Sequence, residues 1–383
     1  MWIPADPYAG GMPTLSDAVG LLHSWYPPAT AESWDTVGLV YGEESAPVSK
    51  VMFAVDPTLE VAREAIEWGA DLLVVHHPLF LKPVHGFTSA TPKGRTLLAL
   101  AERGCALLTA HTNADQADGG VSEAFALAIG LEDLTPIRPA EAAARDKIVV
   151  HVPHEQAARV REALAGAGAG ALGAYDQASY TSTGWGRFRP LPGAQPSIGV
   201  IGEPGEVSES RIEAVLPRER RGAVVAAMLA VHPYEEPAYD VIELADPGTA
   251  ATGTGRIGGV APTTLADFAA QVSRSLPATA HGVRVGGDPD RVVRRVAVCG
   301  GAGDFLLDEV ARLDVDAYVT SDLRHHPAAE FLEKRGPALL DVAHWAAEWT
   351  WLPVVERRLV AAWGDTVETR VSTLPTDPWT IRI

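Results

Sequence analysis

Cysteine is almost absent from this chain of 383 residues. Its two cysteines, Cys105 and Cys299, lie far apart, and neither belongs to a CxxC pair. The sequence therefore contains no disulfide framework and no thiolate metal site. No apolar run reaches the ~18 residues that a membrane-spanning helix needs. Residues 1–6 have neither the basic nor the apolar region of a signal peptide, so we expect a cytoplasmic protein that does not enter a membrane.

Positive charge is also scarce. The chain has 31 Lys and Arg against 49 Asp and Glu, a formal net charge of -18. A surface this acidic repels nucleic acid and anionic membranes, and the densest basic run, 218–221, is short and mixed. We therefore do not expect nucleic acid as a partner. A small anionic molecule is still compatible with this charge, because bound dications reverse the sign of the local field.

Two stretches of the chain alternate short apolar runs with amphipathic segments, one from 14 to 130 and one from 265 to 362. This alternation predicts an α/β domain, with a mostly parallel sheet and helices on both faces. The intervening residues 148–244 follow a β-α-β-β-α-β order, which is typical of a ferredoxin-like α+β fold.

Two polar or small-residue segments, 138–145 and 246–255, flank this change of pattern and are expected to be linkers. The chain is therefore predicted to be one discontinuous α/β domain, residues 1–142 and 250–383, interrupted by an inserted domain at 143–249.

Six of the twelve histidines fall in four short segments, most of which follow expected strands. These segments are His76-His77-Pro78, 111–115, 321–326 and 341–348. Imidazole and carboxylate ligands without thiolate suit Zn, Fe, Mn or Co, and two ions fit if a carboxylate bridges them. The four segments therefore predict a metal site that activates water.

His76 and His77 end a strand of buried type. Adjacent side chains of a regular strand point to opposite faces, so both can serve one site only where the chain bends, and Pro78 marks such a bend. Ligands in open α/β sheets collect at the carboxyl ends of strands. We therefore favour a metal-ligand pair over two surface histidines in a loop.

The segment 111–115 also follows a strand. Asp115 is the better ligand candidate because a carboxylate can bridge two ions, whereas His111 and Asn113 are expected to orient it from outside the ligand set. The alternative for this segment is an Asx-turn.

The third candidate pair is helical. His344 and Glu348 are spaced i, i+4, so both side chains lie on one helix face. The alternative is a solvated first turn with a glutamate near the helix dipole.

His325 and His326 precede Pro327 and resemble the first histidine pair. We expect them to line the same cleft as catalytic acid/base or anion-holding groups, since an imidazole can change its charge near pH 7.

Together these motifs resemble the Nif-three-like family of dinuclear metal proteins, widely labelled GTP cyclohydrolase I type 2 homologues. The resemblance rests on segments 34–39, 56–58, 76–78, 111–115 and 119–120, with His344 and Glu348. In addition, segments 184–190 and 232–237 resemble the PII/CutA-like domain inserted in longer bacterial members. Thr36, Ser321 and Ala343 depart from the usual family residues.

The resemblance implies a split Nif-three-like domain that binds two divalent metal ions per subunit. The implied metal ligands are His76, His77, Asp115, His344 and Glu348, with a bridging carboxylate. The resemblance also implies a toroidal homohexamer. We therefore expect a metal-dependent hydrolase that acts on a small molecule, either a nucleotide or another phosphoester. The alternative is a regulatory protein that binds metal or a metabolite without turnover.

Overall fold

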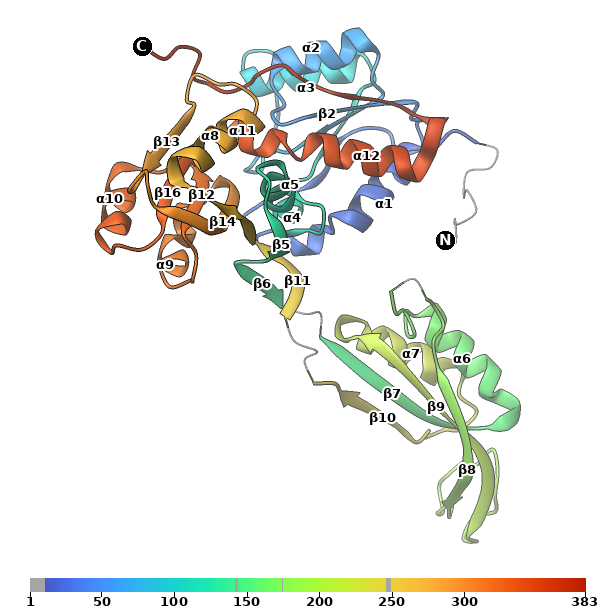
Figure 1. The fold of residues 1–383 in the computed structure, drawn as a ribbon. Coiled ribbons are helices and arrows are strands. Elements are labelled where there is room, and N and C mark those ends of the chain that lie inside the picture. Colours follow the sequence, from blue (N-terminus) through green and yellow to red (C-terminus); the bar gives the residue numbers. More distant parts are fainter. Residues whose placement is uncertain (1–10, 142–143, 174, 246–248) are drawn as a thin grey trace. The chain divides into compact units, whose positions relative to one another are not determined.

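The computed structural model describes residues 11–141, 144–173, 175–245 and 249–383 (Figure 1). The chain separates into two compact units, Met1–Ala140 with Ala250–Ile383, and Glu141–Thr249. The expected boundary between residues 142 and 143 lies outside the described residues. Independent folding of the insert stays a prediction.

The first unit contains a five-stranded sheet in the order β1-β4-β3-β2-β17. Its strands are β1 (Gly38–Tyr41), β2 (Lys50–Ala54), β3 (Leu72–Val75), β4 (Ala106–Thr109) and β17 (Glu368–Val371). All pairs are parallel except β1 with β4. The register places Ala54 beside Val75 and Val75 beside Thr109, so the carboxyl ends of β2, β3 and β4 lie level with one another.

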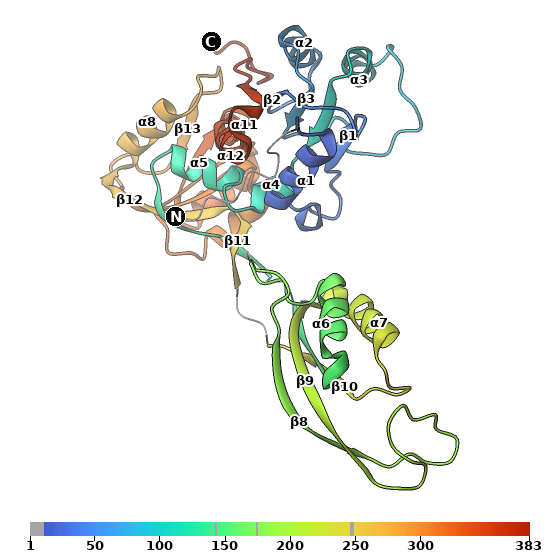
Figure 2. The same cartoon turned by 90° about the vertical axis from the view of Figure 1, so that its right-hand side faces the viewer.

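Helices cover both faces of this sheet (Figure 2). On one face pack α1 (Leu15–Trp25) and α12 (Leu352–Trp363), and on the other α2 (Leu59–Trp68) and α3 (Pro92–Glu102). Local signals set their bounds: Thr58 caps the start of α2 through its side chain, and Gly69 ends the helix at a φ of 80°. No helix in the described ranges is long and apolar enough to span a membrane.

The same unit contains a second, six-stranded sheet in the order β13-β16-β15-β14-β12-β5. Its strands are β5 (Glu132–Thr135), β12 (Arg256–Thr264), β13 (Val283–Gly286), β14 (Val292–Ala302), β15 (Ala317–Ser321) and β16 (Ala338–Val342). The central strands β14, β15 and β16 are parallel, and the other three pair antiparallel. Helix α8 (Leu265–Ser275) covers one face, while α9 (Leu307–Val310) and α10 (His325–Glu333) cover the other.

Two helices contribute to the cores of both sheets. In α5 (Val121–Ala128), Val121 packs against the first sheet and Phe125 against the second. In α11 (His344–Trp349), Trp345 packs in the core of the first sheet and Ala347 in the core of the second. These helices therefore lie between the two sheets, and α11 carries His344 and Glu348 to that position.

The predicted mixed α/β architecture is confirmed, but the mostly parallel pairing holds only for the first sheet. Strand β12 contains Gly258, Gly259 and Pro262, which weaken the sequence signal for a strand. Both expected linkers also contain strand residues, since β6 (Arg138–Glu141) pairs with β11 (Thr249–Thr254). The sequence pattern also predicts one helix over residues 344–362. The structure divides this stretch into α11 and α12 (Leu352–Trp363), because Pro353 has no N–H to continue the first helix.

The second unit is a four-stranded antiparallel sheet in the order β10-β7-β9-β8. Its strands are β7 (Arg145–Pro153), β8 (Tyr180–Phe188), β9 (Gly205–Pro217) and β10 (Tyr239–Glu243). Helices α6 (Ala157–Gly166) and α7 (Arg221–Val231) cover one face and complete the predicted β-α-β-β-α-β order. The sequence pattern also predicts a strand at 197–201, and this prediction is wrong, since the segment is irregular. The classification of the second unit as a ferredoxin-like, PII/CutA-like domain stays a proposal.

Candidate metal centre

The carboxyl ends of two parallel strands supply one side of the site. His76 and His77 directly follow β3, and His111 follows β4. Asp115 lies one turn further, on α4 (Thr112–Gln116). Because β3 and β4 are neighbours, these side chains meet at one edge of the sheet.

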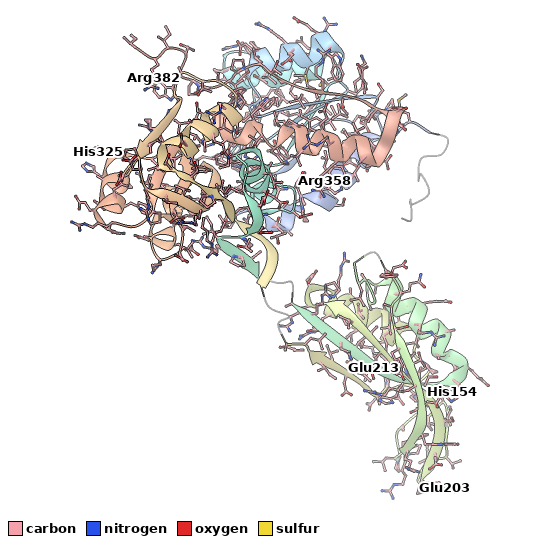
Figure 3. The ribbon with its side chains drawn as sticks, viewed as in Figure 1. His154, Glu203, Glu213, His325, Arg358 and Arg382 are labelled. Atoms are coloured by element: carbon pink, nitrogen blue, oxygen red, sulfur yellow. The ribbon has the colours of Figure 1, made fainter. Side chains whose placement is uncertain are left out.

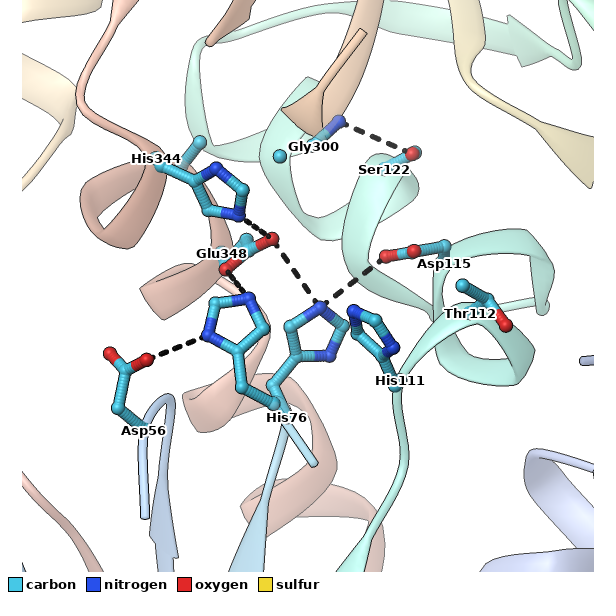
Figure 4. A network of polar contacts seen from close by, with 12 residues as sticks. Asp56, His76, His111, Thr112, Asp115, Ser122, Gly300, His344 and Glu348 are labelled. Atoms are coloured by element: carbon cyan, nitrogen blue, oxygen red, sulfur yellow. Dashed lines mark hydrogen bonds and ion pairs between the residues drawn. The ribbon is translucent and has the colours of Figure 1, made fainter. Parts of the chain in front are cut away.

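Helix α11 supplies the other side, and its Glu348 occupies the centre of the cluster (Figure 4). Glu348 is only 2% exposed. Its Oε1 lies 2.8 Å from His344 Nε2 and 3.4 Å from His76 Nε2, while its Oε2 lies 3.0 Å from His77 Nε2. Asp115 Oδ1 is 3.6 Å from His76 Nε2. One buried carboxylate thus contacts three imidazoles, two that follow β3 and one on its own helix.

Three buried polar atoms in this cluster have no hydrogen-bond partner: His76 Nε2, Asp115 Oδ1 and Glu348 Oε2. Glu348 Oε2 is within ion-pair distance of His77, but without hydrogen-bonding geometry. Leaving a buried polar atom unpaired costs roughly 1–3 kcal/mol, so three such atoms in one cluster indicate a missing partner. Nitrogen and carboxylate donors of this kind fit a divalent metal ion.

The geometry defines two groups whose ligand atoms lie within 4.8 Å of one another. One group consists of His76, His77 and His111, and the other of His77, His344 and Glu348. His77 belongs to both groups. The donor set therefore offers places for more than one ion.

Each histidine of the cluster is oriented through its other ring nitrogen. An acceptor that cannot donate, a carbonyl or a carboxylate, lies against each Nδ1, which must therefore carry the proton and leave Nε2 free for a metal. The pairs are His76 with Ala110 O (2.9 Å), His77 with Asp56 (2.7 Å), His111 with Asp35 (2.9 Å) and His344 with Asp322 (2.6 Å).

The cluster also shifts the pKa values of its members. Burial acts to raise the pKa of Glu348, but His344, His77 and His76 hold it well below its usual value. Glu348 in turn raises the pKa of His344 to about 11, with help from Asp322. Burial opposes the same effect at His77, yet Glu348 and Asp56 raise its pKa to about 10. Without metal, these two imidazoles hold protons that a metal ion must displace.

The pKa values of another carboxylate and another imidazole of the cluster shift in the directions opposite to those of Glu348 and of His77 and His344. Burial raises the pKa of Asp115 to about 6, because the charged carboxylate is desolvated. Burial and the neighbouring His76 lower the pKa of His111 to about 4, against the effect of Asp35. His111 is therefore neutral at pH 7 and able to coordinate a metal.

Gly301, near the end of β14, provides space for the cluster. Its φ is 68°, and a Cβ atom there would lie 2.7 Å from Glu348 Oε1 and 3.3 Å from His344 Nε2. A side chain at this position would therefore displace the central carboxylate. The sequence signal that marks it is the run Gly300-Gly301-Ala302-Gly303 at the end of a strand.

The structure brings together all five residues expected to bind metal, and their role as ligands stays a prediction. It also places His111 among the possible ligands, although the sequence analysis assigned it an orienting role. The sequence analysis missed Asp35, Asp56 and Asp322 as orienting groups. The only signal for Asp35 and Asp56 was their position in the segments 34–39 and 56–58.

His325 and His326 do not belong to either group of possible metal ligands. Both are exposed at the start of α10, and their rings contact each other at a centroid distance of 5.2 Å. Figure 3 shows the His325 side chain at the outer surface beside α10. Their catalytic role stays a prediction that no contact with the cluster supports.

A family model described as Duf34/NIF3 (NGG1p interacting factor 3) matches residues 13–378. The chain belongs to the DUF34/NIF3 family. Among its relatives, a Mycobacterium tuberculosis protein named "GTP cyclohydrolase 1 type 2 homolog" is 47% identical over 369 residues, covering 96% of this chain and 97% of the relative. A Bacillus subtilis protein of the same name is 37% identical over 366 residues, covering 94% and 97%.

Solved structures of DUF34/NIF3 proteins share the fold over the whole chain. A Bacillus cereus protein related to NIF3 is 35% identical, with a TM-score of 0.78, and the match covers 97% of this chain and 99% of that one. A Staphylococcus aureus protein is 28% identical, with the same TM-score and coverage. Each match therefore includes the inserted residues as well as the first unit.

Proposed function

We propose that this DUF34/NIF3 protein is a metal-dependent hydrolase with a dinuclear site. Its ligands would be His76, His77, Asp115, His344 and Glu348, and the ions Zn, Fe, Mn or Co. The names of the relatives, which describe homologues of a GTP cyclohydrolase, agree with a hydrolytic reaction on a nucleotide.

The observation that carries this proposal is the presence of three buried, unpaired polar atoms in one cluster, on His76, Asp115 and Glu348. A structural ion pair would leave its atoms hydrogen-bonded, whereas a metal site leaves lone pairs aimed at a common point. When bound, two such ions lower the pKa of a bound water to near neutrality and stabilise negative charge on a substrate oxygen.

The chain's own residues divide the remaining work. The two oxygens of Glu348 face different imidazoles, which suits a carboxylate that bridges two ions. Asp56 and Asp322 hold the rings of His77 and His344 in place. The side chains of Asp115 and His344 are 26% and 30% exposed, so the cluster is open to solvent on the side where these two residues lie.

We further propose that the substrate is a small anionic molecule, either a nucleotide or another phosphoester. The protein's net charge of -18 would repel such a molecule, so the positive charge of the metals would be needed to bind it. A toroidal hexamer follows from the sequence resemblance and belongs to the same proposal, as does the cytoplasmic location expected from the composition.

Elemental analysis of the purified protein, followed by hydrolysis assays, tests this function. We expect two divalent ions per chain, and hydrolysis of a nucleotide or phosphoester that stops on chelation and returns when metal is restored. A protein that binds no metal at these residues would contradict the metal site. A fully loaded protein that hydrolyses no member of a broad nucleotide and phosphoester panel would contradict the hydrolase.

The second candidate function is a regulatory protein that binds metal or a metabolite without turnover. The observation that favours it is a large cavity in the inserted unit, far larger than a packing defect. Binding of a metabolite to the insert by a metal-loaded protein without hydrolytic activity would support this function over the first.

A further inference from the structure

The inserted unit contains a cavity of about 890 Å³. It lies on the face of the sheet opposite α6 and α7, where Ser182, Glu209 and Arg211 line it. The irregular chain at 189–198 and the segment 234–238 form its other walls. Binding sites for small molecules typically have volumes of roughly 300–1,000 Å³, so this cavity has the size of a ligand site.

A buried carboxylate forms part of the cavity floor. Glu209, on β9, is only 8% exposed, and its Oε1 accepts a hydrogen bond from the Tyr234 hydroxyl at 2.8 Å. No Lys, Arg or His of the described ranges forms an ion pair with it. A buried carboxylate without a cationic partner is costly, so the Oε2 atom has capacity for a ligand that donates hydrogen bonds.

A glycine of β8 makes room for this carboxylate. Gly184 pairs directly with Glu209, and Gly186 follows two residues later on the same face. A Cβ atom on Gly186 would collide with the Glu209 carboxylate. The glycine at position 186 therefore has a physical reason in this fold, since the Glu209 carboxylate occupies the space that a side chain there would fill.

The walls combine apolar surface with a balance of positive and negative charge that the acidic chain as a whole lacks. Trp185, Phe188 and Leu191 supply apolar surface. The charged lining residues are three arginines and three glutamates, in a chain whose acidic residues outnumber its basic ones by 49 to 31. Arg189 forms no ion pair with any carboxylate that the structure describes. The backbone N–H of Gln195 donates to Glu235 at 2.8 Å and ties the irregular segment across the cavity.

We propose that this cavity binds a small molecule that has a planar ring with N–H donors and an acidic tail, and that a purine nucleotide is this molecule. The ring would pack on Trp185 and Phe188, its N–H groups would donate to Glu209, and a phosphate would pair with Arg189. An aromatic amino acid also has a planar ring, N–H donors on its ammonium group and an acidic carboxylate, but it fills less of the cavity. This site does not depend on the metal centre.

Fluorine NMR of the full-length, metal-loaded protein tests the site directly. Trp185 is the only tryptophan between residues 143 and 249, so in 5-fluorotryptophan-labelled protein its resonance is identified by its loss in Trp185→Phe. We expect AMP or GMP to shift this resonance saturably, while the resonances of the first unit stay in place. Titrations with phenylalanine and tyrosine decide between the two sources of the same chemistry. No shift with any of these ligands would overturn the proposal.

Calorimetric titration of variants tests the residues. We expect Glu209→Gln to weaken binding on the order of tenfold to a hundredfold, as loss of a hydrogen bond to a charged group does. Gly186→Ala should abolish binding because its methyl group displaces the carboxylate. The matched control is Glu162→Gln, on α6 across the sheet, which should bind as wild type does.

The oligomeric state distinguishes a ligand site from a contact between copies of the chain. Sedimentation velocity should give the same state for wild type and for Glu209→Gln. A changed state without ligand binding would assign this face to an interface and overturn the proposal, as would wild-type affinity in Glu209→Gln.

Discussion

At the scale of single residues, the candidate metal centre is a cluster of opposite charges, in which imidazoles offset the charge of a buried carboxylate. Glu348 and Asp115 are both acidic and both reach His76, yet their pKa values shift in opposite directions. The difference arises because Glu348 contacts three imidazoles, whereas burial dominates at Asp115. Removal of either carboxylate should therefore affect metal binding more than folding.

We predict that Asp115→Ala and Glu348→Ala each lose at least one metal ion per chain while the fold is retained. The sheets do not depend on either side chain, so the circular dichroism spectrum should be unchanged. Metal content of the purified variants is the measurement. Glu356→Ala, on the neighbouring helix α12 outside the cluster, is the control and should keep full metal content. Wild-type stoichiometry in both cluster variants would refute the assignment.

The pKa shifts also predict how metal stabilisation depends on pH. In the metal-free protein the pKa values of His77 and His344 are raised to about 10 and about 11. Their ion pairs with Glu348 therefore stabilise the fold fully below pH 6.5, which is the pKa of these imidazoles in the unfolded chain. This contribution is lost as the pH rises toward the folded-state values of 10–11. Metal-bound imidazoles are neutral and lose nothing over this range.

We therefore expect the rise in Tm produced by saturating metal to grow between pH 6.5 and 8.5. The measurement is the thermal unfolding of metal-free and metal-loaded protein across this range. His326→Ala is the control, because His326 lies outside the cluster, and it should show the same dependence. A metal-induced rise that stays constant or falls with pH would contradict the protonated state of the two imidazoles.

At the scale of elements, the position of a histidine in the candidate metal centre depends on the segment after β17, which lies outside the strands that carry the histidines. The chain after β17 returns to the sheet, where Ser372 N–H donates to Phe53 O at 2.8 Å and the Ser372 hydroxyl donates to Glu64 at 2.6 Å. Four residues later, the Thr376 hydroxyl donates to Asp56 Oδ2, whose Oδ1 holds His77. The C-terminal segment thus supports a metal ligand through two hydrogen bonds.

We predict that Thr376→Val lowers metal affinity by up to the roughly 10–100-fold typical of groups that orient a ligand, and that Thr376→Ser restores it. Competition with a chromogenic chelator measures the affinity. Thr369→Val is the matched control, since the Thr369 hydroxyl donates to Glu356 rather than toward the metal centre. Equal affinities for the two valine variants would show that Thr376 does not position His77.

At the scale of the whole molecule, the described contacts divide into two units. All residues of the metal centre belong to the first unit, and the cavity belongs to the second. Each unit also has its own buried core, and the core of the second combines residues of α6, α7, β7 and β9. This division predicts that the first unit folds without the second.

We predict that replacing residues 143–249 by a short linker leaves a protein that unfolds cooperatively and binds the same number of metal ions. The pairing of β6 with β11 brings the two cut ends together, which favours such a replacement. Calorimetry and elemental analysis are the measurements. Non-cooperative unfolding of the joined remainder would contradict the proposed boundary.

The sequence by itself determined those features that depend on local periodicity and chain chemistry. The sequence pattern predicts helices at 221–231 and 265–275, and α7 and α8 have these bounds. The prediction holds because the spacing of apolar residues in both helices, and the Thr264 cap of α8, are local properties. His76, His77 and Asp115 could be assigned to one edge because parallel strands bring their carboxyl ends together. The i, i+4 spacing likewise placed His344 and Glu348 on one helix face.

Only the tertiary structure decided which distant residues complete the site. Asp35 and His111 are 76 residues apart, and Asp56 and His77 are 21 apart. No local pattern relates the members of these pairs, because their contact results from the pairing of β1 with β4 and of β2 with β3 in the first sheet. The division into two sheets was equally invisible, since strands such as β12 have few apolar residues. The burial that leaves one polar atom each of His76, Asp115 and Glu348 without a hydrogen-bond partner exists only once both sheets have packed around them.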